Sequence, residues 1–574
     1  MKIQLNRTTR FNLPFSFRFL FVVIILLALL PSTSGQDLGN IGKQKPVTLS
    51  GNLSLRLNTF NTSAINSTRD PFFWTISGSP TLSLYGIAFP FTIAISDKQK
   101  DFRQPFNMYG VSPYFKKIRF HAGYRTVYFS DYTLSDHIFL GGGIEAEPSI
   151  FRFGFVYGRF MKAVEPVKDT ISGQYAEPSF ARKGFAAKFG LGKSNNFVDF
   201  IVLKLHDDTT SVKIKPTDVG APAAENMVFG IKTRQVFAKI FTFDADFGLS
   251  AYTFDLRSAE LNIDKYKALD FMSGLFIPRE STQFLMAGKA SFGIRVRKLS
   301  VKINYRRVEP EYQSMGAYYL NTDIENLTVA PAWQMFKSRL RINGSIGFQR
   351  NNLFSDKVNN TVRRANSLSM SFAPNSKWGM NINYSNYNMS QTRNYTIVRD
   401  TLSLEQFSNN LSGNLFFNFG TKTHRQNVNF SMNYLNLDDN SSRSSVSNST
   451  TSLNPSASYR FTNTDKKISF NINTNASDFK TDKNETLRWG LSSGLSKTLA
   501  QDKLKTGVNI SYYSTHLNGE SYSTTMSVGA NIGYQPHKGH SFNIGLNLVN
   551  RSFTVVTQPG STDFLGNFGY TFNF

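Results

Sequence analysis

Apolar and polar residues alternate along most of this chain, and this period of two constrains its fold more than any other feature. The segment 241–253 shows the pattern clearly. Its odd positions are apolar and its even positions are polar or small: Phe241, Phe243, Ala245, Phe247, Leu249 and Ala251 against Thr242, Asp244, Asp246, Gly248 and Ser250. Because successive side chains of a β-strand point to opposite faces, each such segment predicts a strand with one apolar and one polar face.

The predicted strands follow one another as hairpins. Between residues 340 and 574 we predict twelve strands, joined alternately by short turns such as 463–466 and by long Ser/Asn-rich loops such as 436–455. Eleven more are predicted before them, at 47–59, 80–95, 111–129, 138–147, 150–161, 183–192, 197–206, 227–236, 239–255, 284–297 and 299–308. Further strands or inward-folding loops could lie in four remaining spans, 60–79, 162–180, 256–283 and 309–338.

The alternation of loop lengths favours a membrane barrel over a soluble sandwich, because outer-membrane barrels have short periplasmic turns and long external loops. After residue 36 no run of about 18 apolar residues occurs, which excludes a helical membrane protein. A barrel of so many strands has a wide, wet lumen, so we assign the apolar face to lipid and the polar face to the lumen. The fold class we predict is all-β: a large transmembrane antiparallel β-barrel of about 24 strands, within a range of roughly 20 to 26.

Three regions are expected along the chain. Residues 1–35 have the features of a secretory signal peptide, with four basic residues before the apolar stretch Phe19–Leu30 and small residues after it. That stretch would rise only about 18 Å as a helix, too little for a hydrocarbon core of about 30 Å. Residues 36–46 are then a short periplasmic segment, and 47–574 form a single barrel in the bacterial outer membrane.

The final strand ends in a run of alternating aromatic residues, Phe568, Tyr570, Phe572 and Phe574. This run resembles the C-terminal β-signal of bacterial outer-membrane proteins, and the resemblance implies that the barrel-assembly machinery is a partner. The segment 305–320 and the Asn-rich second half look like barrels of the Bacteroidota, some of which associate with the type 9 secretion translocon. TonB-dependent transporters carry a plug domain before their first strand, whereas here the strand pattern begins by Val47.

The sequence offers little for catalysis. It contains no cysteine, which excludes disulfides, thiol nucleophiles and Cys-ligated metals. None of the seven histidines lies in a recognisable hydrolase pattern, and His537 and His540 fit a solvated turn better than a metal site. Gly141–Gly143 continues into a strand and is no phosphate loop. We therefore expect no enzyme activity and no cofactor or metal.

The excess of basic residues is the feature that remains. Seven of them lie on or beside the polar face of neighbouring predicted strands: Lys289, Arg295, Arg297, Lys302, Arg306, Arg339 and Arg341. They could line an electropositive stretch of lumen that favours anions. Alternatively, they pair with carboxylates such as Asp244 and Asp246, or face lipopolysaccharide phosphates. Nucleic acid is not an expected partner, despite the formal net charge of +25.

Two functions fit these features. The first is a passive pore for hydrophilic solutes, among them anions, in a membrane of lipid and lipopolysaccharide. The second is a non-enzymatic accessory or structural subunit of an outer-membrane complex, with an occluded lumen, because an unplugged barrel of this size would breach the permeability barrier. The span 309–338 could block the lumen in cis, and long loops such as 387–410 could bind a partner.

Overall fold

The computed structural model describes residues 46–64, 70–85, 87–97, 108–115, 117–165, 179–213, 222–261, 274–393, 404–440, 448–555 and 558–574. The expected signal peptide and nearly all of the short segment after it lie outside these ranges. Within them, no helix is long and apolar enough to cross a membrane.

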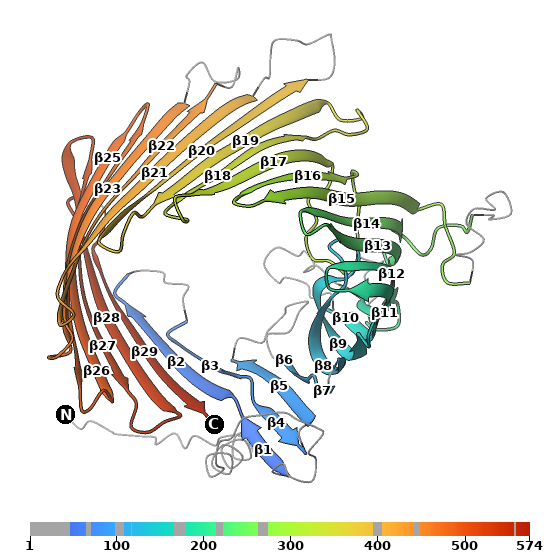
Figure 1. Cartoon of the computed structure of the whole chain (residues 1–574), viewed down its shortest axis with the longest axis horizontal. Helices are drawn as coiled ribbons and strands as arrows, with labels where there is room; N and C mark the ends of the chain where they lie inside the picture. The colour runs from blue at the N-terminus through green and yellow to red at the C-terminus, as the bar shows by residue number, and fades with distance from the viewer. Residues whose placement is uncertain are drawn as a thin grey trace, which may run out of the picture.

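The described residues form one antiparallel sheet that closes on itself (Figure 1). The first fourteen strands are β1 (Val47–Ser50), β2 (Asn52–Thr62), β3 (Phe72–Gly78), β4 (Thr81–Leu84), β5 (Ile87–Ser96), β6 (Met108–Val111), β7 (Tyr114–Phe115), β8 (Ile118–Tyr128), β9 (Ser135–Ala146), β10 (Phe151–Met161), β11 (Ala181–Lys193), β12 (Asn196–Asp208), β13 (Glu225–Phe237) and β14 (Phe241–Thr253). The others are β15 (Thr282–Val296), β16 (Leu299–Val308), β17 (Ile324–Met335), β18 (Leu340–Arg350), β19 (Asn359–Phe372), β20 (Trp378–Arg393), β21 (Leu404–Gly420), β22 (His424–Asp439), β23 (Asn448–Asn463), β24 (Ile468–Thr481), β25 (Glu485–Leu499), β26 (Leu504–Leu517), β27 (Glu520–Tyr534), β28 (His540–Phe553) and β29 (Ser561–Asn573).

Three pairs of these elements are single strands with an interruption. The pairs are β1 with β2, β3 with β4, and β6 with β7. The pairing register does not change from β1–β4 to β2–β3, and it is the same for β6 and β7 against each of their neighbours, β5 and β8. The interruptions fall at Gly51, whose φ is +125°, and at Pro80 and Pro113, which have no N–H for the ladder. Because β2 pairs with β29, the described chain forms a closed barrel of 26 strands. The predicted fold class is confirmed, with a strand count at the upper end of the predicted range.

Strand predictions held best in the second half, where β18–β29 are the twelve strands expected between 340 and 574. The predicted strands 80–95 and 111–129 were wrong as single strands, because each contains a tight turn, between β4 and β5 and between β7 and β8. The span 60–79 holds β3, and the span 309–338 holds β17.

The turns beside the C-terminus, predicted to be periplasmic, connect strands by two to five residues. The connections at the opposite end, which we call the external end, are mostly longer and reach 254–281 between β14 and β15. Two of them are short, at 482–484 and 518–519. The expected alternation of loop lengths therefore holds for most of the barrel.

The outward face carries the apolar residues over most of the barrel. Phe247, Phe292 and Ile303 are 41%, 39% and 41% exposed on neighbouring strands, as side chains in a lipid-facing band would be. The opposite face of β20–β28 is polar and internally hydrogen-bonded. Its cross-strand contacts include Asn414 Nδ2 to Asn429 Oδ1 at 2.7 Å, Ser431 Oγ with Ser456 Oγ at 2.6 Å and Ser511 Oγ with Ser527 Oγ at 2.9 Å.

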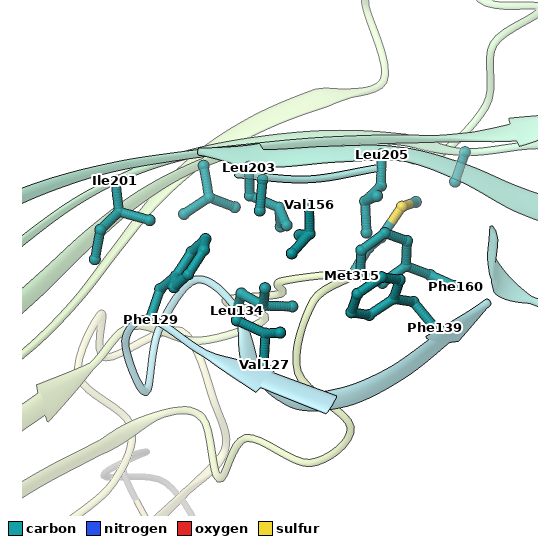
Figure 2. Close-up of a cluster of buried hydrophobic side chains, with 13 residues drawn as sticks. Val127, Phe129, Leu134, Phe139, Val156, Phe160, Ile201, Leu203, Leu205 and Met315 are labelled. Atoms are coloured by element: carbon teal, nitrogen blue, oxygen red, sulfur yellow. The ribbon is translucent and has the colours of Figure 1, made fainter. Parts of the chain in front are cut away.

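The face assignment is wrong at one corner of the barrel. On β12, Phe200 is 56% exposed on the outside, yet Ile201, Leu203 and Leu205 on the inward face are also apolar and fully buried. The wall curves so that side chains of the β8–β9 hairpin, among them Val127 and Leu134, point toward these three residues (Figure 2). This corner of the lumen therefore holds an apolar core instead of water, because the facing walls pack against each other.

Candidate functional site

Two connections at the external end pack against inward-facing side chains of the barrel wall. The first inner loop, 129–134, joins β8 to β9, and the second inner loop, 309–323, joins β16 to β17. They contact Asn226 of β13 and Asp246 of β14, which lie on the inward face of the sheet. The exposed Phe247 lies on the outward face. The span 309–338 thus contains both of the features that the sequence left open, a loop that folds inward and a strand.

The two inner loops are hydrogen-bonded to each other. Tyr312 Oη donates to the main-chain oxygen of Tyr132 at 2.7 Å, and Ser314 Oγ donates to that of Thr133 at 2.6 Å. At the start of β9, the Ser135 N–H donates to the oxygen of Gly316 at 2.9 Å. These contacts satisfy main-chain groups that would otherwise be buried without partners.

The second inner loop is also fixed to the wall. The Met315 N–H donates to Asn226 Oδ1 at 3.0 Å, and Ser250 Oγ donates to the main-chain oxygen of Gln313 at 2.6 Å. Asn226 Nδ2 in turn donates to Ser250 Oγ at 2.8 Å. The side chain of Met315 enters the apolar core of the corner (Figure 2). A buried polar network and the apolar packing of Met315 together hold the loop in place.

A carboxylate on β14 fixes the first inner loop. Asp246, which is 1% exposed, accepts hydrogen bonds from Ser130 Oγ at 2.6 Å and from the Asp131 N–H at 3.1 Å. The Asp131 carboxylate forms an ion pair with Lys289 of β15. Burial alone would raise the pKa of Asp131, but hydrogen bonds from Lys289 and Tyr128 outweigh it and hold that pKa below its ordinary value.

A cavity of about 610 Å³, which we call the basic cavity, lies in the same wall. Five basic residues of β13, β15 and β16 line it, together with two carboxylates of β14: Lys232, Arg234, Lys289, Lys302 and Arg306 with Asp244 and Asp246. Arg234 pairs with Asp244 at 3.2 Å, and Lys289 pairs with Asp131. In the described part of the chain, neither Lys302 nor Arg306 forms an ion pair, and the buried Nε of Arg306 has no hydrogen-bond partner.

The basic cavity includes three of the seven predicted basic residues, Lys289, Lys302 and Arg306. The other four lie nearer the C-terminal end of the barrel: Arg295 near the end of β15, Arg297 in the next turn, Arg339 in the turn before β18, and Arg341 at the start of β18. Lys232 and Arg234 were missed. Their two-residue spacing on β13 could have placed both on the polar face of that strand. In the folded sheet Lys232 lies opposite Asp246, and Asp246 lies opposite Lys289.

The structure also brings together three residues that the sequence did not connect. Ser112 Oγ lies 3.0 Å from His121 Nδ1, and His121 Nε2 lies 3.3 Å from Glu145 Oε2. A hydrolase would need main-chain N–H groups near the serine to stabilise an oxyanion. Here the Ser112 N–H is bonded to the oxygen of Pro90 at 2.9 Å, and the next residue is Pro113. We therefore assign this trio a structural role, in which Ser112 and Glu145 provide hydrogen-bond partners for the two ring nitrogens of the buried His121.

The remaining predicted positions lie at the C-terminal end of the barrel. His540 is partly buried rather than solvated, with Nδ1 2.9 Å from Tyr570 Oη and its ring stacked on Phe572 at 4.6 Å. Phe568, Tyr570 and Phe572 are on β29, and the Phe574 N–H donates to the oxygen of Gly51 at 3.0 Å where the barrel closes. Among the residues described, no three His, Asp or Glu side chains are grouped as a metal site would require.

The fold and the lumen thus define a large transmembrane β-barrel, filled at one corner and polar elsewhere. No protein-family model matches the chain, and no curated protein matches its sequence. Among solved structures, the chain is similar to Acinetobacter baumannii OccAB2, at 10% identity over 61% of this chain and 93% of that one, with a TM-score of 0.29. It is also similar to the P pilus usher (PapC) translocation pore, at 9% identity over 92% and 99% of the two chains, with a TM-score of 0.37. Pseudomonas aeruginosa OpdK with vanillate matches at 8% identity over 92% and 99%, with a TM-score of 0.27.

Proposed function

We propose that this protein is an outer-membrane channel through which hydrophilic solutes diffuse, with a preference for anions. The observation that carries the proposal is the basic cavity, where five cations face two carboxylates and a third carboxylate comes from Asp131. Like charges in a confined lumen concentrate counter-ions and so raise the local concentration of anionic solutes.

The state of Arg306 and Lys302 supports the preference for anions. The buried Nε–H of Arg306 has no acceptor among the described residues. Buried donors are satisfied in most proteins, and a guanidinium group is well suited to carboxylate or phosphate oxygens. Lys302 and Arg306 have no carboxylate partner among the described residues, so their charge attracts an anion at this point of the wall.

The polar wall supports passive transport. Asn and Ser side chains on β20–β28 bond mainly to one another across the strands, as Asn414 does with Asn429. All four apolar clusters of the described chain lie between Val127 and Ile324, on the other side of the barrel. A solute would therefore pass between the basic cavity and a polar wall that also carries cations such as Arg460 and Arg488.

Location and assembly belong to the same proposal. The apolar outward band needs a bilayer, and residues 1–35 would direct export to the outer membrane before removal. The aromatic residues of β29 would be read by the barrel-assembly machinery, with lipid and lipopolysaccharide as surroundings. The apolar band and the aromatic end of β29 support a Gram-negative origin, and the segment 305–320 with the Asn-rich second half supports a Bacteroidota-type one.

The test is single-channel recording of the mature chain, residues 36–574, in planar bilayers under a salt gradient. We expect discrete conductance steps with a reversal potential that indicates anion preference. The double substitution Lys302→Gln with Arg306→Gln should move the reversal potential toward zero. Lys497→Gln, which removes one charge from the outward face of β25, should leave it unchanged. Verified insertion without conductance would contradict the channel and favour the accessory subunit with an occluded lumen.

A further inference from the structure

A second cavity, of about 680 Å³, lies beside the second inner loop, and we call it the aromatic cavity. The loop forms most of its wall. The rest comes from β9, β10, β11 and β14 near the external end: His137, Met161, Arg182 and Tyr252. Cavities of a few hundred cubic ångströms are the usual size of small-ligand sites.

The second inner loop has a buried side and an exposed side. Tyr312, Ser314 and Met315 are 1%, 6% and 4% exposed and fix the loop to the corner of the barrel. Tyr318 and Tyr319 are 41% and 95% exposed at the aromatic cavity. The loop therefore presents two aromatic rings from an anchored main chain, which lowers the entropy lost when a ligand binds.

The ring of Tyr318 is held in place. It stacks on His137 with centroids 4.0 Å apart and an angle of 16° between the planes, and its Oη accepts the Ile138 N–H at 3.1 Å. The ring of Tyr319 follows at 6.5 Å, tilted by 36°. An exposed aromatic face offers apolar contact that is otherwise uncommon in a water-filled lumen.

The polar groups of the aromatic cavity carry little net charge. Arg182 is already bound by two hydrogen bonds to Asp207, at 2.8 and 3.3 Å. Apart from the tyrosines, the polar side chains of the loop at this cavity are one carboxylate, two amides and two hydroxyls: Glu311, Gln313, Asn321, Ser314 and Thr322. This composition differs from the surplus of cations in the basic cavity and does not favour an anionic ligand.

We propose that the aromatic cavity binds a neutral carbohydrate. The C–H faces of a pyranose ring match the exposed faces of Tyr318 and Tyr319, and its hydroxyl groups both donate and accept hydrogen bonds, as the amides and Glu311 require. A sugar needs no charged partner, and the aromatic cavity has no free surplus of charge. The proposal goes beyond the channel function and does not rest on it, because an occluded barrel would present the same cavity.

The test measures binding directly, by calorimetry on the mature chain in detergent. The probes are the neutral trisaccharides maltotriose, cellotriose, mannotriose and xylotriose. We expect saturable binding of at least one probe. Tyr319→Ala should weaken it about tenfold, since loss of one aromatic contact is worth on the order of that factor. Phe354→Ala, which removes another exposed aromatic ring at the external end, should leave it unchanged.

Three results would overturn the proposal. The first is that no trisaccharide binds although the protein is folded by circular dichroism. The second is that Tyr319→Ala and Tyr318→Ala bind sugar as the unmodified chain does, which would place the site elsewhere. The third is competition by benzoate at equal concentration, which would show that the cavity takes anions. Each can be obtained whether or not the barrel conducts ions, so failure here and failure of the channel are distinguishable.

Discussion

The phenolic ring of Tyr312 meets the ring of Tyr132 edge to face, with centroids 6.3 Å apart, and its Oη donates to the main-chain oxygen of Tyr132 at 2.7 Å. The two residues are 180 positions apart in the chain, and each is 1% exposed. Their contact joins the first and second inner loops. The filled corner of the lumen is therefore one connected structure rather than two separate flaps.

Gly248→Ala should disrupt this joint. A Cβ at Gly248 would lie 2.5 Å from Tyr312 Oη and 2.8 Å from Tyr132 Cβ, both closer than van der Waals contact. Overpacking of this kind typically costs about 1–3 kcal/mol, so we expect a lower free energy of unfolding in urea and larger, noisier conductance steps.

Gly413→Ala is the matched control, because a Cβ there would meet nothing within 4 Å. It should leave both measurements unchanged. Equal effects of the two substitutions would mean that Gly248 acts through the conformation of its strand and not through the tyrosines.

Acid should loosen the first inner loop. Although burial raises the pKa of Asp131, its hydrogen bonds to Lys289 and Tyr128 hold the pKa below the ordinary 3.8. A carboxylate with a depressed folded-state pKa stabilises the fold fully above the unfolded value and loses that contribution as the pH falls through the folded one. Hydrogen exchange of residues 129–134, corrected for the intrinsic rate, should therefore rise as the pH is lowered below about 4.

Asp131→Asn tests the cause of that acid response. The variant lacks the ion pair with Lys289 at every pH, so its first inner loop should exchange faster already at neutral pH and change less in acid. A rise in exchange of the unmodified chain between about pH 7 and 5 would point to another group instead, since Asp131 stays ionised there.

The sequence predicted β18–β29 well because lipid on one side and water on the other impose a strict alternation there. It failed where this contrast is absent. The prolines at 80 and 113 break the early strands, so β3 and the β6–β7 strand do not show a regular pattern. On β12 both faces are apolar, since Leu203 packs against another part of the wall. Such long-range packing leaves no periodic signal in a single strand.

The candidate site was predicted only in part for the same reason. Lys289, Lys302 and Arg306 were identified from alternation on β15 and β16, and the register brings them together. The aromatic cavity depends on how a loop turns inward, and Tyr318 meets His137 only in the folded barrel. Local sequence around either residue contains no sign of the other.

Phe574→Ala should separate assembly from stability. The main-chain bonds that close the barrel, Phe574 N–H to Gly51 O at 3.0 Å and Gly51 N–H to Phe574 O at 2.9 Å, do not need the side chain. The variant loses the ring contact with Phe572 at 5.1 Å, which is worth about 1 kcal/mol. If β29 carries an assembly signal, the refolded variant should be nearly as stable as the unmodified chain, whereas its amount in outer membranes of cells should fall several-fold. Phe564→Ala, on the same strand, should not reduce that amount.

Asn226 should be the most sensitive polar residue of the filled corner. It is fully buried, donates to Ser250 Oγ at 2.8 Å and to the oxygen of Ala251 at 3.0 Å, and accepts the Met315 N–H at 3.0 Å. Asn226→Ala leaves the Met315 N–H without its acceptor, and a buried unsatisfied group costs about 1–3 kcal/mol.

Asn226→Asp separates two explanations for that loss. The substitution keeps the acceptor for Met315 but removes both donated bonds and buries a charge, so it should destabilise the fold at neutral pH at least as strongly as alanine. At about pH 4 or below, a protonated carboxyl could donate to Ser250 again, and the free energy of unfolding should recover toward that of the unmodified chain. If alanine instead proved harmless, the second inner loop would be held by the packing of Met315 and Tyr312 alone.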